Sequence, residues 1–265
     1  MPEGDTIFRT AMALRIALGG KLVRRFEAPR LRFEPMPPGT RVRAVEARGK
    51  HVLIPFDDGR VLHTHLQMSG SWRIERPGAR PGSSSPAVRA LIEVPDALAV
   101  CLRAPVVELL RGSDLARHPW LAALGPDLCS AEVDLDAVLA RLERLPPDTP
   151  IGVALLDQRV ACGIGNVVKS ETLFARAVDP FVPLGAVDLE TRRSLYATAS
   201  ELLRRNLGGG PRTTAPGGLA VYGKPGRPCP RCGAPIASRR QGEAARTTYW
   251  CPACVADLAP ERVAP

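Results

Sequence analysis

The chain has 265 residues, a formal charge of +9 at pH 7 and a hydrophobic fraction of 45%. This length accommodates more than one domain, no apolar run is long enough to span a bilayer, and the start lacks the order of a secretory signal. We therefore expect a cytoplasmic protein, and its basic charge indicates a polyanionic partner such as nucleic acid. The charge can also reflect genome composition, because only four of the 36 basic residues are lysine.

The first three residues, Met1-Pro2-Glu3, carry unusual chemistry. Because methionine is removed before a small residue such as proline, we expect Pro2 to have a free secondary amine. Such an amine attacks an aldehyde-like carbon to give an iminium ion, and the Glu3 carboxyl can transfer protons in the same step. The alternative is an ordinary chain terminus. Asp5 is expected to cap a helix over residues 6–18, which would place Pro2 and Glu3 at a helix N-terminus.

Short strands are predicted from residue 21 to residue 110. The candidates are Leu22–Glu27, Arg41–Glu46, His51–Phe56, Val61–Gln67, Ser71–Glu75, Val88–Val94, Ala97–Leu102 and Val106–Leu110. Asp57-Asp58-Gly59 predicts a hairpin between the third and fourth of them. So many strands close together indicate a β-sandwich or a barrel.

Two turns between these strands carry candidate functional residues. Lys50, in Arg48-Gly49-Lys50-His51, can be a phosphate ligand, an acid/base group or a solvated lysine at a strand end. Gln67 and Met68 follow a strand, and such a polar–apolar pair can wedge into a DNA base stack or form a plain hairpin turn. His63 and His65 share one strand face without acidic neighbours in the sequence, so we expect core or edge histidines and no metal ligands.

The pattern becomes helical after about Gly112. Helices are expected over Leu135–Leu145, Ile151–Gln158 with Thr149 as cap, residues 166–175 and Asp188–Leu207, followed by a glycine-rich linker over Gly208–Gly218. Gly163-Ile164-Gly165-Asn166 predicts a helix–turn–helix in which Asn166 caps the second helix. The amides of that helix and the Asn166 side chain can grip a phosphate. An ordinary helical corner is the alternative.

Four of the seven cysteines form two Cys-x2-Cys pairs near the C-terminus, separated by 18 residues. They are Cys229, Cys232, Cys251 and Cys254. Each pair lies on a tight turn that directs two thiolates to one point, and four thiolates make a closed tetrahedral zinc site. We expect one structural Zn²⁺ that holds a β-hairpin with Arg239, Arg240 and Arg246 near its tip.

These motifs together resemble the Fpg/Nei family of DNA glycosylases over nearly the whole chain. The resemblance is carried by Pro2-Glu3-Gly4, Arg48-Gly49-Lys50, Leu155-Leu156-Asp157-Gln158 with the glycine turn, and Val221-Tyr222-Gly223 before the cysteine hairpin. It implies an α+β multidomain fold. The expected domains are an N-terminal catalytic β-sandwich with a leading helix over residues 1–127, a helix–two-turn–helix DNA-binding domain with its linker over 128–218, and a zinc finger over 219–265.

The resemblance also assigns catalytic roles. Pro2 would be the nucleophile that attacks C1′ of the damaged nucleotide, and Glu3 the proton donor that opens the sugar. Lys50 would lie near the lesion phosphate and serve β-elimination, and Arg246 would serve δ-elimination. Thr6 stands where many family members have glutamate, which leaves open how a proton relay at that place works here.

The family pattern assigns DNA contacts as well. Asn166 and Arg246 would form a phosphate-gripping pair, and Met68 with Gln67 would fill the gap left by the flipped-out base. The expected partner is damaged duplex DNA bound by a monomer in the nucleoid, with no membrane.

We therefore expect a bifunctional DNA glycosylase and AP lyase of base excision repair, which cuts the strand by β,δ-elimination. Oxidised pyrimidines are favoured, because Pro2-Glu3-Gly4 and the short linker look like the Nei branch and residues 104–110 lack the arginine–phenylalanine pattern of the 8-oxoguanine enzymes. The alternatives are a non-enzymatic zinc-finger DNA-binding protein, an 8-oxoguanine-preferring glycosylase, and a scaffold that acts only on single-stranded DNA.

Overall fold

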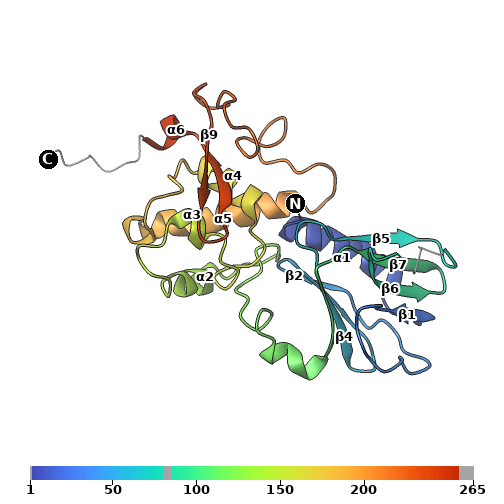
Figure 1. Cartoon of the computed structure of the whole chain (residues 1–265). Coiled ribbons are helices and arrows are strands. Elements are labelled where there is room, and N and C mark those ends of the chain that lie inside the picture. Colours follow the sequence, from blue (N-terminus) through green and yellow to red (C-terminus); the bar gives the residue numbers. More distant parts are fainter. Residues whose placement is uncertain (1, 80–84, 257–265) are drawn as a thin grey trace. The chain divides into compact units, whose positions relative to one another are not determined.

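Two units, residues 1–123 and 124–265, make up the chain in the computed structural model, which describes residues 2–79 and 85–256 (Figure 1). We call them unit 1 and unit 2 and describe each by itself. No helix in these two described ranges is long and apolar enough to cross a membrane.

Unit 1 begins with helix α1, Gly4–Leu18, whose apolar side chains at helical spacing are buried. Its N-cap is Glu3, whose backbone is extended and whose carbonyl accepts the N–H of Ile7 at 2.9 Å. Asp5 lies inside the first turn, where its Oδ1 accepts the N–H of Thr6 at 2.6 Å. The predicted Asp5 cap is therefore wrong. The helix begins at Gly4, before Asp5, and the N-cap position is occupied by Glu3.

Two four-stranded antiparallel sheets form the predicted β-sandwich of unit 1, with strand orders β1-β6-β7-β5 and β2-β3-β4-β8. The strands are β1 (Arg25–Glu27), β2 (Glu46–Arg48), β3 (His51–Pro55), β4 (Arg60–His65), β5 (Ser71–Glu75), β6 (Val88–Val94), β7 (Ala97–Leu102) and β8 (Val106–Arg111), and the 3₁₀ helix η1 (Gly112–Arg117) follows. Strand β1 is shorter than the predicted Leu22–Glu27, and β2 begins at Glu46, where the predicted second strand Arg41–Glu46 ends. Leu22 and Arg41 form only an isolated bridge with each other.

The two faces of the β2-β3-β4-β8 sheet differ in character. Val52, Ile54, Leu62 and Val107 point into the sandwich core, which also receives the apolar face of α1. Side chains alternate along a strand, so the intervening residues occupy the opposite face. The predicted turn at residues 57–59 joins β3 to β4 and sets a register in which His51 pairs with His65. The sheet therefore carries its histidines on the face away from the core.

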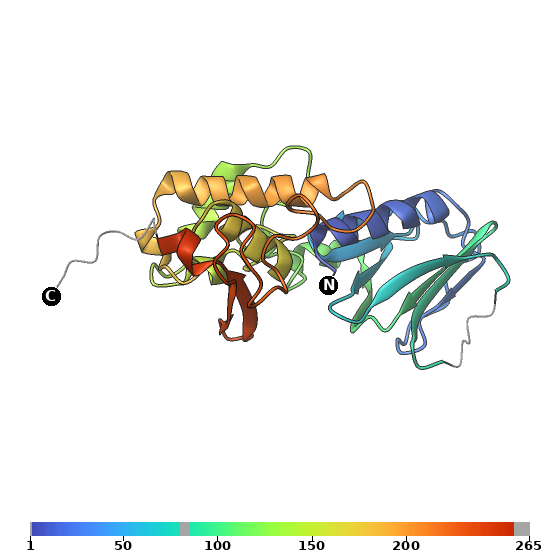
Figure 2. The same ribbon diagram turned by 90° about the horizontal axis from the view of Figure 1, so that it is seen from above.

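Unit 2 is helical and ends in a β-hairpin. Its elements are α2 (Leu135–Leu142), α3 (Ile151–Ala154), α4 (Asn166–Ala175), η2 (Leu184–Ala186), α5 (Leu189–Arg205), β9 (Ala237–Gln241), β10 (Arg246–Trp250) and α6 (Pro252–Ala256). Asp134 and Asp188 cap α2 and α5 through hydrogen bonds from Ala137 and Thr191. Helix α4 packs against α5, the long orange helix in Figure 2, and against β10.

The helix boundaries of unit 2 differ from the prediction in three places. Pro150, not Thr149, is the N-cap of α3, and this helix stops at Ala154 because i→i+3 bonds replace the helical pattern over the next residues. Helix α2 also ends before residue 145. Gly165 is the N-cap of α4, so Asn166 is the first helical residue and does not cap the helix. The Asn166 side chain is thereby free to bond elsewhere.

Candidate active site and zinc centre

The structure gives Pro2 and Glu3 an ordered place at the start of α1. Pro2 is half-buried, and Glu3, as the N-cap residue, has a side chain with 0% exposure. Removal of Met1 stays a prediction, because Met1 lies outside the described residues. A nucleophile candidate and a buried carboxyl thus lie next to each other at a helix N-terminus, where free amides favour a nearby anion such as phosphate.

Thr6 has a buried carboxylate beside it. Asp5 has 0% exposure, and its Oδ1 accepts the Thr6 hydroxyl at 3.2 Å in addition to the Thr6 amide. Thr6 occupies the position where the family resemblance expects glutamate. A carboxyl group is still present beside it, on Asp5.

Lys50 lies in the two-residue turn between β2 and β3. Arg48 pairs directly with His51, and Gly49 has a φ of 57°, which a hairpin of this length requires and which glycine adopts without strain. Lys50 is half-buried. Burial and the nearby Lys50 charge both lower the pKa of His65, to about 4, and burial with the neighbouring histidines lowers the pKa of His51 to about 2. The Lys50 charge therefore acts on a face lined by neutral imidazoles.

Gln67 and Met68 form the exposed tip of the loop between β4 and β5. Met68 is 62% exposed, and Gln67 has a φ of 45°, which a non-glycine residue rarely adopts. The tip is held at its base, where His65 Nδ1 accepts the N–H of Gln67 at 3.2 Å and Gly70 donates to the carbonyl of Leu66 at 2.8 Å. An anchored loop that presents an exposed methionine fits a wedge that enters a base stack.

In unit 2 the side chain of Asn166 contacts Thr247, the residue that follows Arg246. Asn166 Nδ2 donates to the carbonyl of Thr247 at 2.7 Å, and Arg246 is exposed at the start of β10. One N–H of the Asn166 amide is therefore used to hold the hairpin. Lys169, fully buried on the same helix, donates from Nζ to Thr248 Oγ1 at 2.7 Å and anchors the same strand.

Glu171 on α4 is a residue that the sequence analysis did not single out. Its buried carboxylate accepts the main-chain N–H groups of Ala220, Val221 and Tyr222 at 2.7, 2.9 and 2.7 Å, and it also accepts the Thr214 hydroxyl. These contacts fix the segment before the cysteine hairpin to the helix that begins with Asn166. The only signal in the sequence was that Glu171 is the single acidic residue of this helix.

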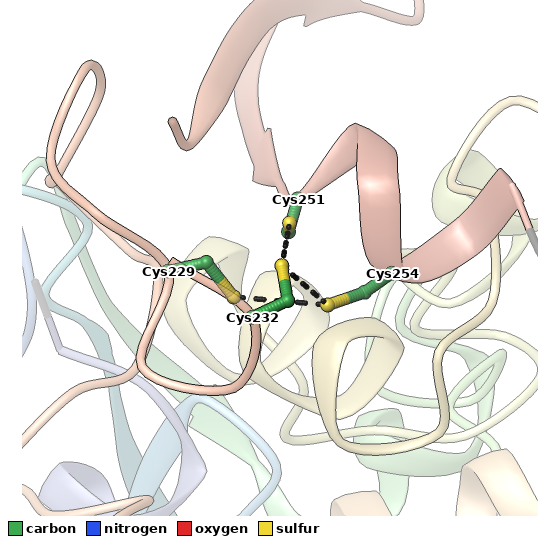
Figure 3. A group of neighbouring side chains, drawn as sticks. All are labelled: Cys229, Cys232, Cys251 and Cys254. Carbon is green, nitrogen blue, oxygen red and sulfur yellow. Dashed lines mark hydrogen bonds between the residues drawn. The ribbon is translucent and has the colours of Figure 1, made fainter. Parts of the chain in front are cut away.

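The four cysteines meet in one cluster, as predicted (Figure 3). Cys229 and Cys232 come from the loop before β9, Cys251 follows β10, and Cys254 lies on α6. The Sγ–Sγ separations are 3.7 Å for Cys229–Cys254, and 3.5 Å for both Cys232–Cys251 and Cys254–Cys232. Four sulfurs at about 2.3 Å from a tetrahedral zinc lie about 3.8 Å apart, so this donor set fits one structural Zn²⁺.

His63 has no acidic neighbour in the sequence but has one in the folded chain. Glu108 stands opposite His63 on β8, and its Oε2 lies 2.8 Å from His63 Nδ1 and 3.0 Å from His118 Nε2. The sequence did not reveal this neighbour because β4 and β8 are far apart along the chain and become adjacent only in the sheet.

Three family models match consecutive parts of the chain. They are the formamidopyrimidine-DNA glycosylase N-terminal domain over residues 1–103, the formamidopyrimidine-DNA glycosylase H2TH domain over 124–215 and the zinc finger found in FPG and IleRS over 226–256. The last two segments contain Asn166 and all four clustered cysteines.

Relatives of known name match over almost their full length. The "Probable endonuclease 8 2" of Streptomyces coelicolor is 40% identical, covering 98% of this chain and 96% of the relative. The "DNA-(apurinic or apyrimidinic site) lyase Nei2" of Mycolicibacterium smegmatis is 38% identical, covering 96% and 98%.

A solved structure shares the fold. Lactococcus lactis formamidopyrimidine-DNA glycosylase, bound non-covalently to DNA with an AP site, superposes with a TM-score of 0.81 at 22% identity, covering 95% of this chain and 98% of that one. At this identity the likeness shows only the architecture. Together with the domain matches and the 40% identical relative, it establishes that the chain belongs to the Fpg/Nei family, in its endonuclease 8 branch.

Proposed function

We propose that this family member is a bifunctional DNA glycosylase and AP lyase of base excision repair that removes oxidised pyrimidines and cuts the strand by β,δ-elimination. The observation that carries the proposal is the fully buried Glu3 at the N-cap of α1 with Pro2 directly before it. A carboxyl held beside a candidate amine nucleophile is the arrangement that covalent excision of a base requires.

In the first step the Pro2 nitrogen bonds to C1′ of the damaged nucleotide. Glu3 donates a proton that opens the sugar ring, the base leaves, and the secondary amine remains bound as an iminium ion. Attack requires the unprotonated amine, and free α-amines titrate near pH ~7.7–8.0 in peptides. A cation such as Lys50 in the same unit would help to keep Pro2 neutral.

In the second step the iminium ion makes the C2′ proton acidic, so the same intermediate leads to strand scission. Lys50, in its tight turn, is assigned to β-elimination and to the phosphate at the lesion. Arg246 is assigned to δ-elimination. Hydrolysis of the remaining iminium then releases Pro2 for another cycle.

The remaining residues hold the DNA. Excision needs the base out of the stack, which costs a few kcal/mol. Met68 and Gln67 would fill the gap, and Arg246 with the second N–H of Asn166 would grip the phosphate backbone. Duplex DNA as substrate, a monomeric enzyme and a cytoplasmic, nucleoid-associated location belong to the same proposal.

The pyrimidine preference rests on the sequence features that resemble the Nei branch and on strand β8. Residues 106–111 form a strand of the sheet, hydrogen-bonded to β4, so they are engaged in the sandwich. The 8-oxoguanine enzymes fill the duplex gap with an arginine–phenylalanine segment at this place. Residues 106–111 are held in a sheet and do not form a long loop that could do so. A lesion panel of duplexes with an oxidised pyrimidine or 8-oxoguanine tests this preference directly.

Borohydride trapping tests the chemistry. Incubation of the zinc-loaded protein with abasic-site DNA and borohydride should give a covalent complex whose cross-link maps to Pro2. Glu3→Gln should lose base excision and keep trapping on a preformed abasic site, because only the proton donor is changed. Absence of trapping would favour the non-enzymatic DNA-binding alternative, and a cross-link at a lysine would exclude Pro2 as the nucleophile.

A further inference from the structure

The guanidinium group of Arg239, on strand β9 of unit 2, lies over an aromatic ring. Its Cζ is 3.8 Å from the ring centroid of Phe181, which belongs to the segment between α4 and η2. The Arg239 side chain is exposed, and it makes no hydrogen bond or ion pair with any residue in the described ranges 2–79 and 85–256. A guanidinium that a ring orients while its N–H groups remain unused is ready to receive an anion.

The ring under Arg239 is itself held in place. The N–H of Phe181 donates to Asp179 Oδ1 at 2.9 Å, and the rings of Phe181 and Trp250 pack edge to face with their centroids 4.8 Å apart. Trp250 ends β10 and directly precedes the zinc-binding Cys251. The orientation of the Arg239 guanidinium therefore depends on the metal-bound hairpin and on the segment that carries Phe181.

A second arginine of unit 2 shows how a structural stack differs from this one. Arg231 Cζ lies 4.5 Å from the ring centroid of Phe174, and its Nη2 also donates to the carbonyls of Phe174 and Ala175 at 2.9 and 3.2 Å. These bonds satisfy carbonyls of the last turn of α4, which have no partner within the helix. Arg239 has no such partners, so its charge and its N–H groups are available to a ligand.

The pairing of β9 with β10 places Arg239 on the same face of the hairpin as Arg246. Arg239 is opposite Thr248, and Arg246 is opposite Gln241. Directly opposite residues of an antiparallel pair point to the same side, and so do residues two apart on one strand. Arg239 and Arg246 are therefore diagonal neighbours, which lie about 7–8 Å apart in such a ladder.

We propose that Arg239, oriented by Phe181, binds a second phosphate of the DNA backbone beside the phosphate that Arg246 contacts. A phosphodiester is an anion with two free oxygens, and the planar guanidinium fork can donate to both of them. Such a contact positions the DNA and carries no sequence information. The inference rests on the proposed function, because it takes Arg246 as a phosphate contact, and it extends the DNA-binding surface along one face of the hairpin.

The salt dependence of DNA binding measures this contact. The zinc-loaded protein is titrated with duplex DNA that contains a reduced abasic site, which has no aldehyde carbon for Pro2 to attack. Arg239→Ala should reduce the magnitude of the slope of log K against log salt by about 0.9, the share of one phosphate contact. A slope equal to that of the wild-type protein would overturn the proposal.

Arg240 supplies the matched control, because it is the next residue of β9, has the same charge and is also exposed. It is opposite Thr247 and therefore points to the other face of the hairpin. Arg240→Ala should leave the slope unchanged. An equal decrease for Arg239→Ala and Arg240→Ala would mean that the hairpin attracts DNA only through its total charge, which would also overturn the proposal.

Phe181→Leu separates the orientation of the guanidinium from its charge. The slope should stay at the wild-type value, and the affinity should fall roughly threefold at every salt concentration, because a free Arg239 side chain must be ordered on binding. Arg239→Lys, which keeps the charge without the planar fork, should give the same pattern. Wild-type affinity in both variants would refute the role of the ring.

Hydrogen exchange over residues 237–250 tests whether the stack serves only to pack the hairpin. We expect Arg239→Ala to keep the wild-type protection of these amides, and lost protection would overturn the proposal in favour of a structural role. Failure of the proposed function is a separate result. Absence of borohydride trapping at Pro2 in the wild-type protein would refute the proposed chemistry, whereas the salt slopes of the three arginine variants would still decide the contact of Arg239.

Discussion

Each of the two units is stabilised internally in a different way. Unit 1 has one large apolar cluster, made by two sheets and α1. Its candidate reacting groups lie at the start of α1 and in the turns between strands. The hairpin of unit 2 has a small core that includes three of the four zinc-binding cysteines, and buried polar groups such as Lys169, Glu171 and Thr248 fix it to α4. A small module that cannot bury much apolar surface needs metal and polar anchors.

This difference separates how the two units respond to conditions. Loss of zinc should affect unit 2, because all four clustered cysteines belong to it. Acid should affect unit 1, because all four histidines belong to it. The comparison can therefore be tested one unit at a time within the intact chain.

Zinc removal is expected to have the largest effect. Structural zinc contributes apparent binding free energies of about 10–16 kcal/mol in zinc-finger peptides at pH 7, so chelation should unfold the hairpin and abolish DNA binding. Hydrogen exchange should show lost protection over residues 237–250 and retained protection over residues 88–102. Full DNA binding after verified zinc loss would show that the polar anchors suffice without metal.

Removal of the Glu171 carboxylate should have the next largest effect. Glu171→Ala leaves the buried amides of Ala220, Val221 and Tyr222 without their acceptor, and hydrogen bonds to charged groups contribute about 1.5–3 kcal/mol each. The opening free energy of these amides, measured by hydrogen exchange, should fall by on the order of 3 kcal/mol or more. Glu201→Ala on α5 is the control, because its ion pair with Arg205 is exposed and contributes under ~1 kcal/mol. Equal effects of the two changes would contradict the anchoring role.

Acid should destabilise strands β3 and β4 of unit 1 more than helix α5 of unit 2. Burial lowers the pKa of His51 to about 2 and of His65 to about 4, so the unfolded chain, with ordinary values near 6.5, takes up protons first as the pH falls. Stability is complete above pH ~6.5 and decreases below it, by about 2 kcal/mol for each of these histidines between pH 6.5 and 5.

The measurement is hydrogen exchange of strands β3 and β4 against α5 at pH 7 and pH 5, with intrinsic exchange rates corrected for pH. His65→Asn keeps an acceptor for the Gln67 amide and should reduce the pH dependence. A parallel loss of stability in α5 would mean that the histidines are not its cause.

The smallest effect concerns Arg246. Its exposed guanidinium can be removed without loss of packing, so Arg246→Ala should weaken DNA binding similarly for all sequences. The slope of log K against log salt should decrease in magnitude by about 0.9, the share of one phosphate contact. Arg144→Ala, an exposed arginine elsewhere in unit 2, should leave the slope unchanged. An unchanged slope for Arg246→Ala would remove this residue from the phosphate grip.

Local patterns alone predicted much of the molecule. The bounds of β5, β6 and β7 agree with the predicted ranges, and the cysteine spacing predicted the cluster, because both depend on residues close together in the chain. The helix caps were less predictable. Asp5 and Asn166 are good capping residues, yet the chain uses Glu3 and Gly165, since other bonds engage the two side chains.

Tertiary structure decided which polar groups meet. Glu108 is 45 residues from His63, Glu171 is 49 residues from Ala220, and Asn166 is 81 residues from Thr247. Periodicity predicts the face on which a side chain lies but not the strand or helix that will lie beside it. The sequence by itself therefore determined the chemistry available at Pro2, Glu3 and the cysteines. Only the pairing of β4 with β8, and the packing of β10 on α4, placed the charged groups that orient and anchor the rest.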